Sequence, residues 1–151
     1  MMRLKKSTRY ALYAAMELAK AGDEGQVTAS RVAERYAIPA AVQAKVFQQL
    51  VRARIAVGIR GSGGGYRLAR NASEVTVLDV IEAFEPRRAQ GGCLLAEHTD
   101  SPCALRPGCQ LKRLFDEVDE LARCTFASIT LETLVGRPQP GRGFPVAESA
   151  G

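Results

Sequence analysis

"PAAVQAKVFQQLVRARIAVGIRGSGGGYRLAR", residues 39–70, joins a helical pattern to a hairpin pattern. Pro39 suits the start of a helix, because its missing N–H would have no partner there. Apolar side chains at helical spacing predict the buried stripe of this helix: Val42, Val46, Phe47 and Leu50. Two β-prone runs, residues 55–60 and 66–69, flank a glycine-rich turn and predict a β-hairpin.

Two more helices are predicted upstream, one from an N-cap at Ser7 to about Ala21 and one after an N-cap at Thr28. Three helices followed by a hairpin form the layout of a winged helix-turn-helix, in which one helix enters the major groove of DNA and the hairpin lies along the backbone or minor groove. The predicted fold class is therefore mainly α with a small β-hairpin.

Charge is distributed unevenly along the 151 residues. Residues 1–70 hold 13 Lys and Arg against 4 Asp and Glu (+9), and the remaining residues hold 8 against 12 (−4). A basic first half indicates a polyanion-binding face. No run approaches the roughly 18 apolar residues of a membrane helix, and no export signal is recognisable. We therefore expect a cytoplasmic protein with no membrane partner.

Candidate DNA-binding residues come from the third helix and the hairpin. The helix face opposite the predicted stripe carries small or amide-bearing side chains and no acid; its residues are Ala41, Gln43, Ala44, Lys45 and Gln48. The hairpin candidates are Arg60, Ser62, Gly63, Gly64 and Arg67. A nucleotide-binding phosphate loop is the alternative reading of the glycines, but neither the Lys-Ser/Thr pair nor a following helix is present.

The second half predicts a helix over "TVLDVIEAFEP", residues 76–86, capped by Thr76, and a long helix from Gln110 to about Leu134. Apolar residues in the long helix are spaced close to a heptad seam: Leu111, Leu114, Val118, Leu121 and Thr125. This seam predicts a partner helix in a dimer, with packing onto its own domain as the alternative.

These patterns divide the chain into a DNA-binding domain (1–86), a cysteine-bearing loop (87–109), a dimerisation helix with a short terminal helix (110–135) and a disordered tail (136–151).

Three of the four cysteines lie in one Gly- and Pro-punctuated stretch, as Cys93, Cys103 and Cys109. Soft thiolates suit an iron–sulfur cluster or zinc, and spacings of nine and five intervening residues are wider than the usual zinc pairs. A thiol redox switch and inert cysteines remain open. His98 is a candidate fourth ligand, whereas Cys124 lies about 22 Å along the helix from Cys109 and is predicted to be a buried structural thiol.

The sequence resembles the Rrf family of winged-helix transcriptional regulators, in particular its IscR- and NsrR-like iron–sulfur branch. The similarity covers residues 2 to about 136, in "RLKKSTRYAL", the hairpin "VGIRGSGGGYRLAR", "VTVLDVIEAFEP", the cysteine segment "CALRPGCQLK" and "ITLETLVG". It implies a homodimer on a partly palindromic double-stranded operator, and we expect this regulator to act as a repressor. It also implies that Cys93, Cys103 and Cys109 hold a 2Fe-2S or 4Fe-4S cluster that senses nitric oxide, redox state or iron–sulfur status.

The sequence departs from this family at the fourth cluster ligand. IscR-like proteins have histidine where this chain has Lys112, and NsrR-like proteins use an aspartate where it has Arg9. An unfilled fourth position would leave an iron open to small molecules. The rival function keeps the same fold but makes the cysteines a thiol switch or a zinc site.

An enzyme is not expected, because the chain has no Cys-x-x-Cys pair, no phosphate loop with its lysine and one histidine only.

Overall fold

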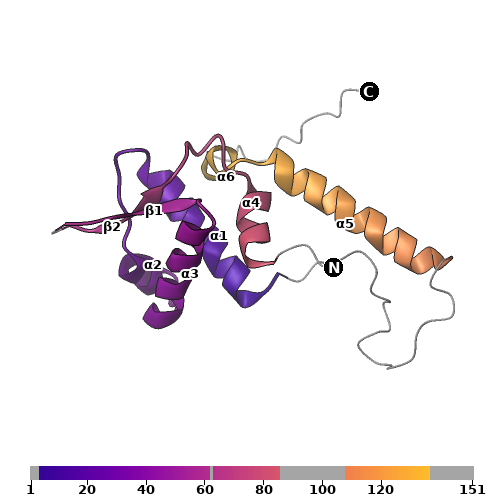
Figure 1. Cartoon of the computed structure of the whole chain (residues 1–151), viewed down its shortest axis with the longest axis horizontal. Helices are drawn as coiled ribbons and strands as arrows, with labels where there is room; N and C mark the ends of the chain where they lie inside the picture. Colours follow the sequence, from indigo (N-terminus) through magenta and orange to yellow (C-terminus); the bar gives the residue numbers. More distant parts are fainter. Residues whose placement is uncertain (1–3, 62, 86–107, 137–151) are drawn as a thin grey trace.

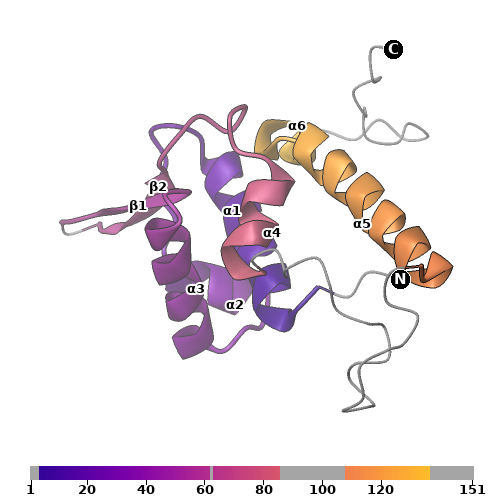
Figure 2. The ribbon, with the colours of Figure 1, turned by 45° about the vertical axis from the view of Figure 1, so that its right-hand side comes forward.

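The computed structural model describes residues 4–61, 63–85 and 108–136. Its elements in chain order are α1 (Lys6–Ala21), α2 (Ala29–Arg35), α3 (Ala40–Arg52), β1 (Ala56–Ile59), β2 (Gly65–Leu68), α4 (Val77–Phe84), α5 (Gln110–Ser128) and α6 (Leu131–Val135). The helices from α1 to α4 and the hairpin form the body of the molecule, and α5 projects away from it (Figures 1 and 2). The described part is mainly helical with a two-stranded antiparallel hairpin, so the predicted winged-helix fold class is confirmed.

The core lies where α1, α3 and the hairpin meet. Its largest fully buried side chains include Phe47, Leu18, Leu50 and Ile55. Phe47 packs against Tyr66 of β2 with ring centroids 4.6 Å apart, which joins α3 to the hairpin. Thr28 caps α2 by accepting a hydrogen bond from the Arg31 N–H, as the sequence predicts.

The hairpin has Ala56 paired with Leu68 and Ile59 paired with Gly65. Val27, in the segment between α1 and α2, adds a bridge to Tyr66 through two backbone hydrogen bonds of 2.8 Å. Gly65 makes this approach possible, because a Cβ there would lie 2.9 Å from the Val27 carbonyl oxygen. The base of the wing is therefore fixed to the helical body.

The N-terminus of α4 is closed by a capping box. Thr76 accepts a hydrogen bond from the Asp79 N–H at 3.1 Å, and the Asp79 carboxylate accepts one from the Thr76 N–H at 2.9 Å. This confirms the N-cap predicted at Thr76. The same residue forms a β-bridge with Thr130, which places α6 beside the start of α4.

The long helix is shorter than the sequence predicts. α5 ends at Ser128, and α6 begins at Leu131 after an N-cap at Thr130, which accepts a hydrogen bond from the Thr133 N–H. Ile129 is buried against Val77 and Ile81 of α4. Burial of Ile129 with an extended backbone, together with the cap at Thr130, ends the helix there.

α1 begins without the predicted cap at Ser7. Its N-cap residue is Lys5, and no side chain of its own sequence neighbourhood caps it. Instead, the Glu85 carboxylate accepts hydrogen bonds from the Lys5 N–H at 2.7 Å and from the buried Thr8 hydroxyl at 2.5 Å. A negative charge from the end of α4 therefore occupies the N-terminus of α1, where the helix dipole favours it.

Candidate functional site

The outer face of α3 carries a line of exposed side chains. They are spaced four, three and four residues apart, so they lie on one side of the helix: Ala41, Lys45, Gln48 and Arg52. Ala44 is half-buried at the edge of this face. Arg52 was missed by the sequence analysis, although its spacing of four from Gln48 points to the same face.

Gln43 was predicted to lie on the DNA-facing side of α3, but its side chain is buried and is not available to a DNA base. It is 0% exposed, and neither its Oε1 nor its Nε2 has a hydrogen-bond partner. Val42, which was expected in the core, is instead 38% exposed. The buried stripe of α3 is therefore Gln43, Val46, Phe47 and Leu50.

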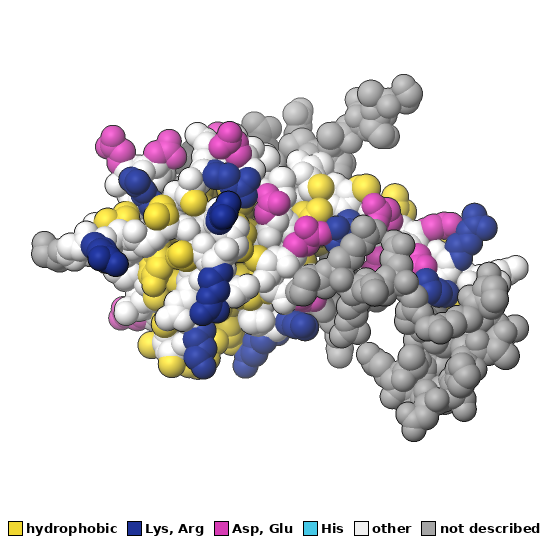
Figure 3. Space-filling view, viewed as in Figure 1, with side chains coloured by type: hydrophobic (Ala, Val, Ile, Leu, Met, Phe, Trp, Pro, Cys, Tyr) yellow, Lys and Arg dark blue, Asp and Glu magenta, His cyan; other side chains and the backbone are white. Residues whose placement is uncertain are grey.

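The wing presents two arginines, one beside its turn and one closer to its base. Arg60 follows β1 directly, Arg67 lies opposite Val57 in β2, and both are exposed. Gly63 is exposed and Gly64 half-buried, whereas Ser62 lies outside the described residues. Lys and Arg side chains also run down the molecular face over α3 (Figure 3). This combination of exposed cations on α3 and on the wing is suited to contacts with phosphate groups.

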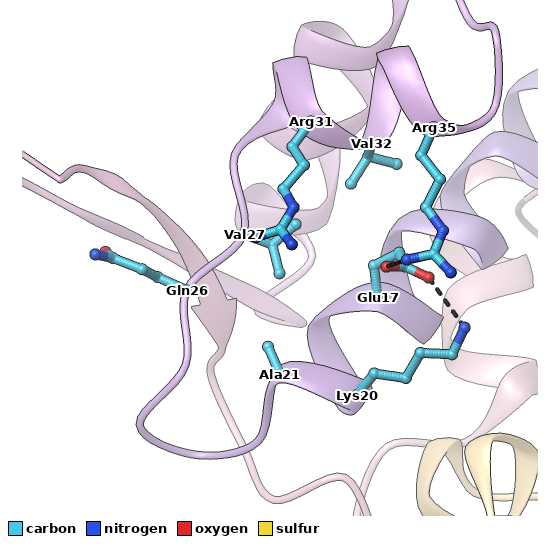
Figure 4. A pocket seen from close by; sticks show the side chains of 8 residues that line it. All are labelled: Glu17, Lys20, Ala21, Gln26, Val27, Arg31, Val32 and Arg35. Carbon is cyan, nitrogen blue, oxygen red and sulfur yellow. Dashed lines mark hydrogen bonds and ion pairs between the residues drawn. The ribbon is translucent and has the colours of Figure 1, made fainter.

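An open pocket of about 220 Å³ lies between α1 and α2. Figure 4 shows Arg35 reaching from α2 to Glu17 on α1, whereas Arg31 extends towards Val27. The Glu17 carboxylate binds Lys20 at 3.0 Å, Arg35 at 3.1 Å and the Tyr36 hydroxyl at 2.8 Å.

Electrostatics in this pocket favour the charged form of Glu17. Burial alone would raise the pKa of Glu17, but the hydrogen bonds from Tyr36 and Lys20 and the charges of Lys20 and Arg35 outweigh it and lower the pKa. Burial and the bond to Glu17 raise the pKa of Tyr36. Since its carboxylate is fully engaged, Glu17 serves as a structural link between α1 and α2.

Two of the three clustered cysteines, Cys93 and Cys103, lie outside the described residues, as does His98. Cys109 is half-buried and occupies the N-cap position of α5. Cys124 is exposed, so the prediction of a buried thiol is wrong. α5 contains no buried residue, and nothing in the described chain covers Cys124.

Cations occupy the two positions, Lys112 and Arg9, at which the resemblance led us to look for a fourth cluster ligand. The Lys112 ammonium forms an ion pair with the Asp116 carboxylate one turn further along α5. Arg9 is exposed on α1. Neither side chain has a lone pair to offer a metal while protonated.

The heptad seam of α5 is exposed along most of the helix. The exposed fractions are 61% for Leu111, 53% for Leu114, 49% for Phe115, 52% for Val118 and 69% for Leu121. Thr125, also exposed, donates its hydroxyl hydrogen bond to the Leu121 carbonyl. Phe115 was not predicted; it widens the apolar face beyond the strict seam.

At its C-terminal end, α5 contacts the rest of the chain. Arg123 forms an ion pair with Glu82 of α4, and Phe126 packs with Val77 and Ile81. The N-terminal two thirds of the apolar face have no such partner among the described residues. None of the helices in the described ranges is long and apolar enough to span a membrane.

The sequence is similar to those of proteins that are named as transcriptional regulators. The Rrf2 family, described as an iron-dependent transcriptional regulator, matches residues 4–137. BadM of Rhodopseudomonas palustris is 38% identical over 134 residues, which are 89% of this chain and 81% of BadM. The HTH-type transcriptional regulator IscR of Photorhabdus laumondii is 30% identical over 144 residues, 91% of this chain and 82% of that protein.

Solved structures show the same fold. CymR, the global cysteine regulator of B. subtilis, superimposes with a TM-score of 0.68 at 24% identity, covering 92% of this chain and all of CymR. IscR of T. potens gives a TM-score of 0.68 at 22% identity over 91% of this chain and 93% of its own. The family match and the similarity to BadM indicate a transcriptional regulator, in agreement with the expectation that the chain is not an enzyme. The chain thus belongs to the Rrf2 family of DNA-binding transcriptional regulators.

Proposed function

We propose that the chain is a homodimeric repressor whose DNA binding responds to nitric oxide, redox state or iron–sulfur status through a cluster held by Cys93, Cys103 and Cys109. The observation that supports this proposal most directly is the position of Cys109. It is a partly exposed thiol at the first residue before α5, the helix with the uncovered apolar face. A group bound there adjoins the element that would set the spacing between two DNA-binding domains.

The donor set suits an iron–sulfur cluster. Three thiolates are soft ligands of the kind that bind iron in such clusters, and a cluster supplies an iron that reacts with small molecules. His98 is the candidate for the fourth position, because Lys112 is engaged with Asp116 and Arg9 is a cation. The proposed site therefore has three cysteine ligands and one candidate histidine ligand at the fourth position.

A second copy of the chain is the proposed occupant of the α5 seam. Five large apolar side chains, each about half exposed or more, would cost free energy if they stayed in water. Their heptad spacing fits another helix of the same kind, and pairing them buries the same surface on both copies.

DNA binding would combine α3 in the major groove with the wing on the backbone. Arg52, Arg60 and Arg67 are exposed cations suited to phosphate contacts, which carry no sequence information. Lys45 and Gln48 are the exposed polar side chains suited to base edges. A partly palindromic operator follows from the two-fold symmetry of a dimer.

The cluster is tested on protein purified without oxygen, by iron and sulfide analysis and by visible absorption before and after addition of nitric oxide. We expect iron and sulfide in the wild type and in Cys124→Ser, and neither in the variant with serine at residues 93, 103 and 109. Wild-type protein that holds zinc without sulfide would contradict the cluster and favour the thiol or zinc alternative. DNA binding is measured on the same samples.

The dimer is tested by sedimentation velocity. We expect Leu114→Glu combined with Leu121→Glu to give monomers, because the dimer would have to bury four carboxylates in its apolar seam, two from each copy. Asp119→Lys, an exposed change on the same helix away from the seam, should stay dimeric. Dimers that persist in the double variant would contradict this interface.

A further inference from the structure

We infer that the first turn of α3 recognises thymine through its C5-methyl group, so that each operator half-site carries thymine opposite this turn. The inference rests on the DNA-binding function proposed above. It starts from three consecutive exposed residues, Ala40, Ala41 and Val42, which begin α3 and carry only methyl groups.

Burial of Gln43 removes the amide that would otherwise have supplied hydrogen bonds near this turn. Residues at the N-terminus of a recognition helix are the ones that contact base edges in helix-turn-helix complexes. In the major groove, hydrogen-bond donors and acceptors line every base pair, and the C5-methyl of thymine is the apolar group. An alkyl side chain therefore gains most binding free energy beside the thymine methyl group. Beside any other base edge it would leave hydrogen-bonding groups of the DNA without a partner.

The exposed polar residues follow one and two turns later. Lys45 suits the O6 and N7 acceptors of guanine, and Gln48 suits adenine. Ala41 and Lys45 are four residues apart, or about 6 Å along the helix axis. This rise corresponds to about two base pairs at 3.4 Å per pair, so the thymine should lie within about two pairs of the guanine.

The DNA side is tested with duplexes selected from a random-sequence pool by the purified wild-type protein. Each thymine of the selected half-site is then replaced singly by deoxyuridine, which keeps all hydrogen bonds and removes only the methyl group. We expect one or two replacements near the guanine to weaken binding about four-fold each, the loss for one buried methyl group. Replacements elsewhere should have little effect.

The protein side uses a matched pair of valines on one helix. Val42 is 38% exposed at the start of α3, and Val51 is 37% exposed at its end. In Val42→Ala or Ala41→Ser, replacing thymine by deoxyuridine should cost less affinity than in the wild type. The reason is that the thymine methyl group has already lost part of its apolar contact with the protein. Val51→Ala should leave the penalty at its wild-type value.

Three results would overturn the inference and leave DNA binding standing. The first is a selected half-site without thymine near the guanine. The second is a loss of DNA affinity below 1.5-fold, about 0.2 kcal/mol, for every deoxyuridine replacement. The third is a loss of affinity on deoxyuridine replacement that is the same in both first-turn variants as in the wild type. A pool from which no sequence is enriched, with no salt-dependent binding to any duplex, would instead overturn the proposed function and this inference with it.

Discussion

Replacement of Gln43 by methionine should stabilise the protein. Both polar atoms of the Gln43 side chain are buried without a hydrogen-bond partner, and the side chain is 0% exposed. A buried amide left unsatisfied costs about 1–3 kcal/mol, and methionine has a similar length without that cost. We therefore expect Gln43→Met to raise the free energy of unfolding by about 1–3 kcal/mol.

Gln49 provides the matched control on the same helix. Its Nε2 donates a hydrogen bond of 3.0 Å to the Ala83 carbonyl near the end of α4. Gln49→Met removes this bond and should lower the free energy of unfolding by about 1 kcal/mol. Two identical substitutions six residues apart are thus expected to have opposite signs.

Urea unfolding monitored by circular dichroism measures both variants, with the slope of the transition required to stay constant. The Gln43 variant should also melt a few degrees higher, at about 2–4 °C per kcal/mol for a chain of this size. Destabilisation by Gln43→Met, with Gln49→Met behaving as expected, would show that the Gln43 amide has a partner. DNA affinity should be unchanged by Gln43→Met, because this side chain does not reach the outer face of α3.

Four further outcomes are expected. Arg54→Gly should stabilise by about 1 kcal/mol in thermal unfolding, because Arg54 has a positive φ of 57° after α3. Thr76→Ala should cost about 1 kcal/mol in the same assay by opening the capping box. Glu17 has a lowered pKa, so its contribution to the free energy of unfolding is present above its unfolded pKa of about 4.3 and is lost as the pH falls through its folded pKa. Glu17→Gln should therefore lose less stability at acid pH than the wild type, measured by urea unfolding at a series of pH values. Arg60→Ala should weaken binding and reduce the salt slope by about one, measured by fluorescence anisotropy; an unchanged slope would remove the wing arginine from DNA contact.

The helix phase of α3 shows what the sequence determines and what it leaves open. Val46, Phe47 and Leu50 fix the buried side correctly, and position 43 completes their spacing of three, four and seven. Residue chemistry favoured Val42 over Gln43 at the neighbouring position, and packing geometry decided against it. A buried polar residue of this kind cannot be found from hydrophobicity alone.

Long-range contacts account for the other differences. The cap of α1 comes from Glu85, 77 residues after Thr8, so no local pattern could have replaced Ser7 with it. Cys124 was expected to be buried because free cysteines usually are, but α5 meets the body only near its C-terminal end. The hairpin, by contrast, depends on local turn and strand signals: β1 lies within the predicted run 55–60, and β2 begins at Gly65, one residue before the predicted run 66–69.

The helix α4 binds two distant parts of the chain through acidic side chains one turn apart. Glu82 binds Arg123 of α5, and Glu85 closes the N-terminus of α1. The chain enters its cysteine-bearing segment immediately after Glu85. Withdrawing this carboxylate would remove the hydrogen-bond acceptor of the buried Thr8 hydroxyl, so displacement of Glu85 carries an energetic cost at the N-terminus of α1.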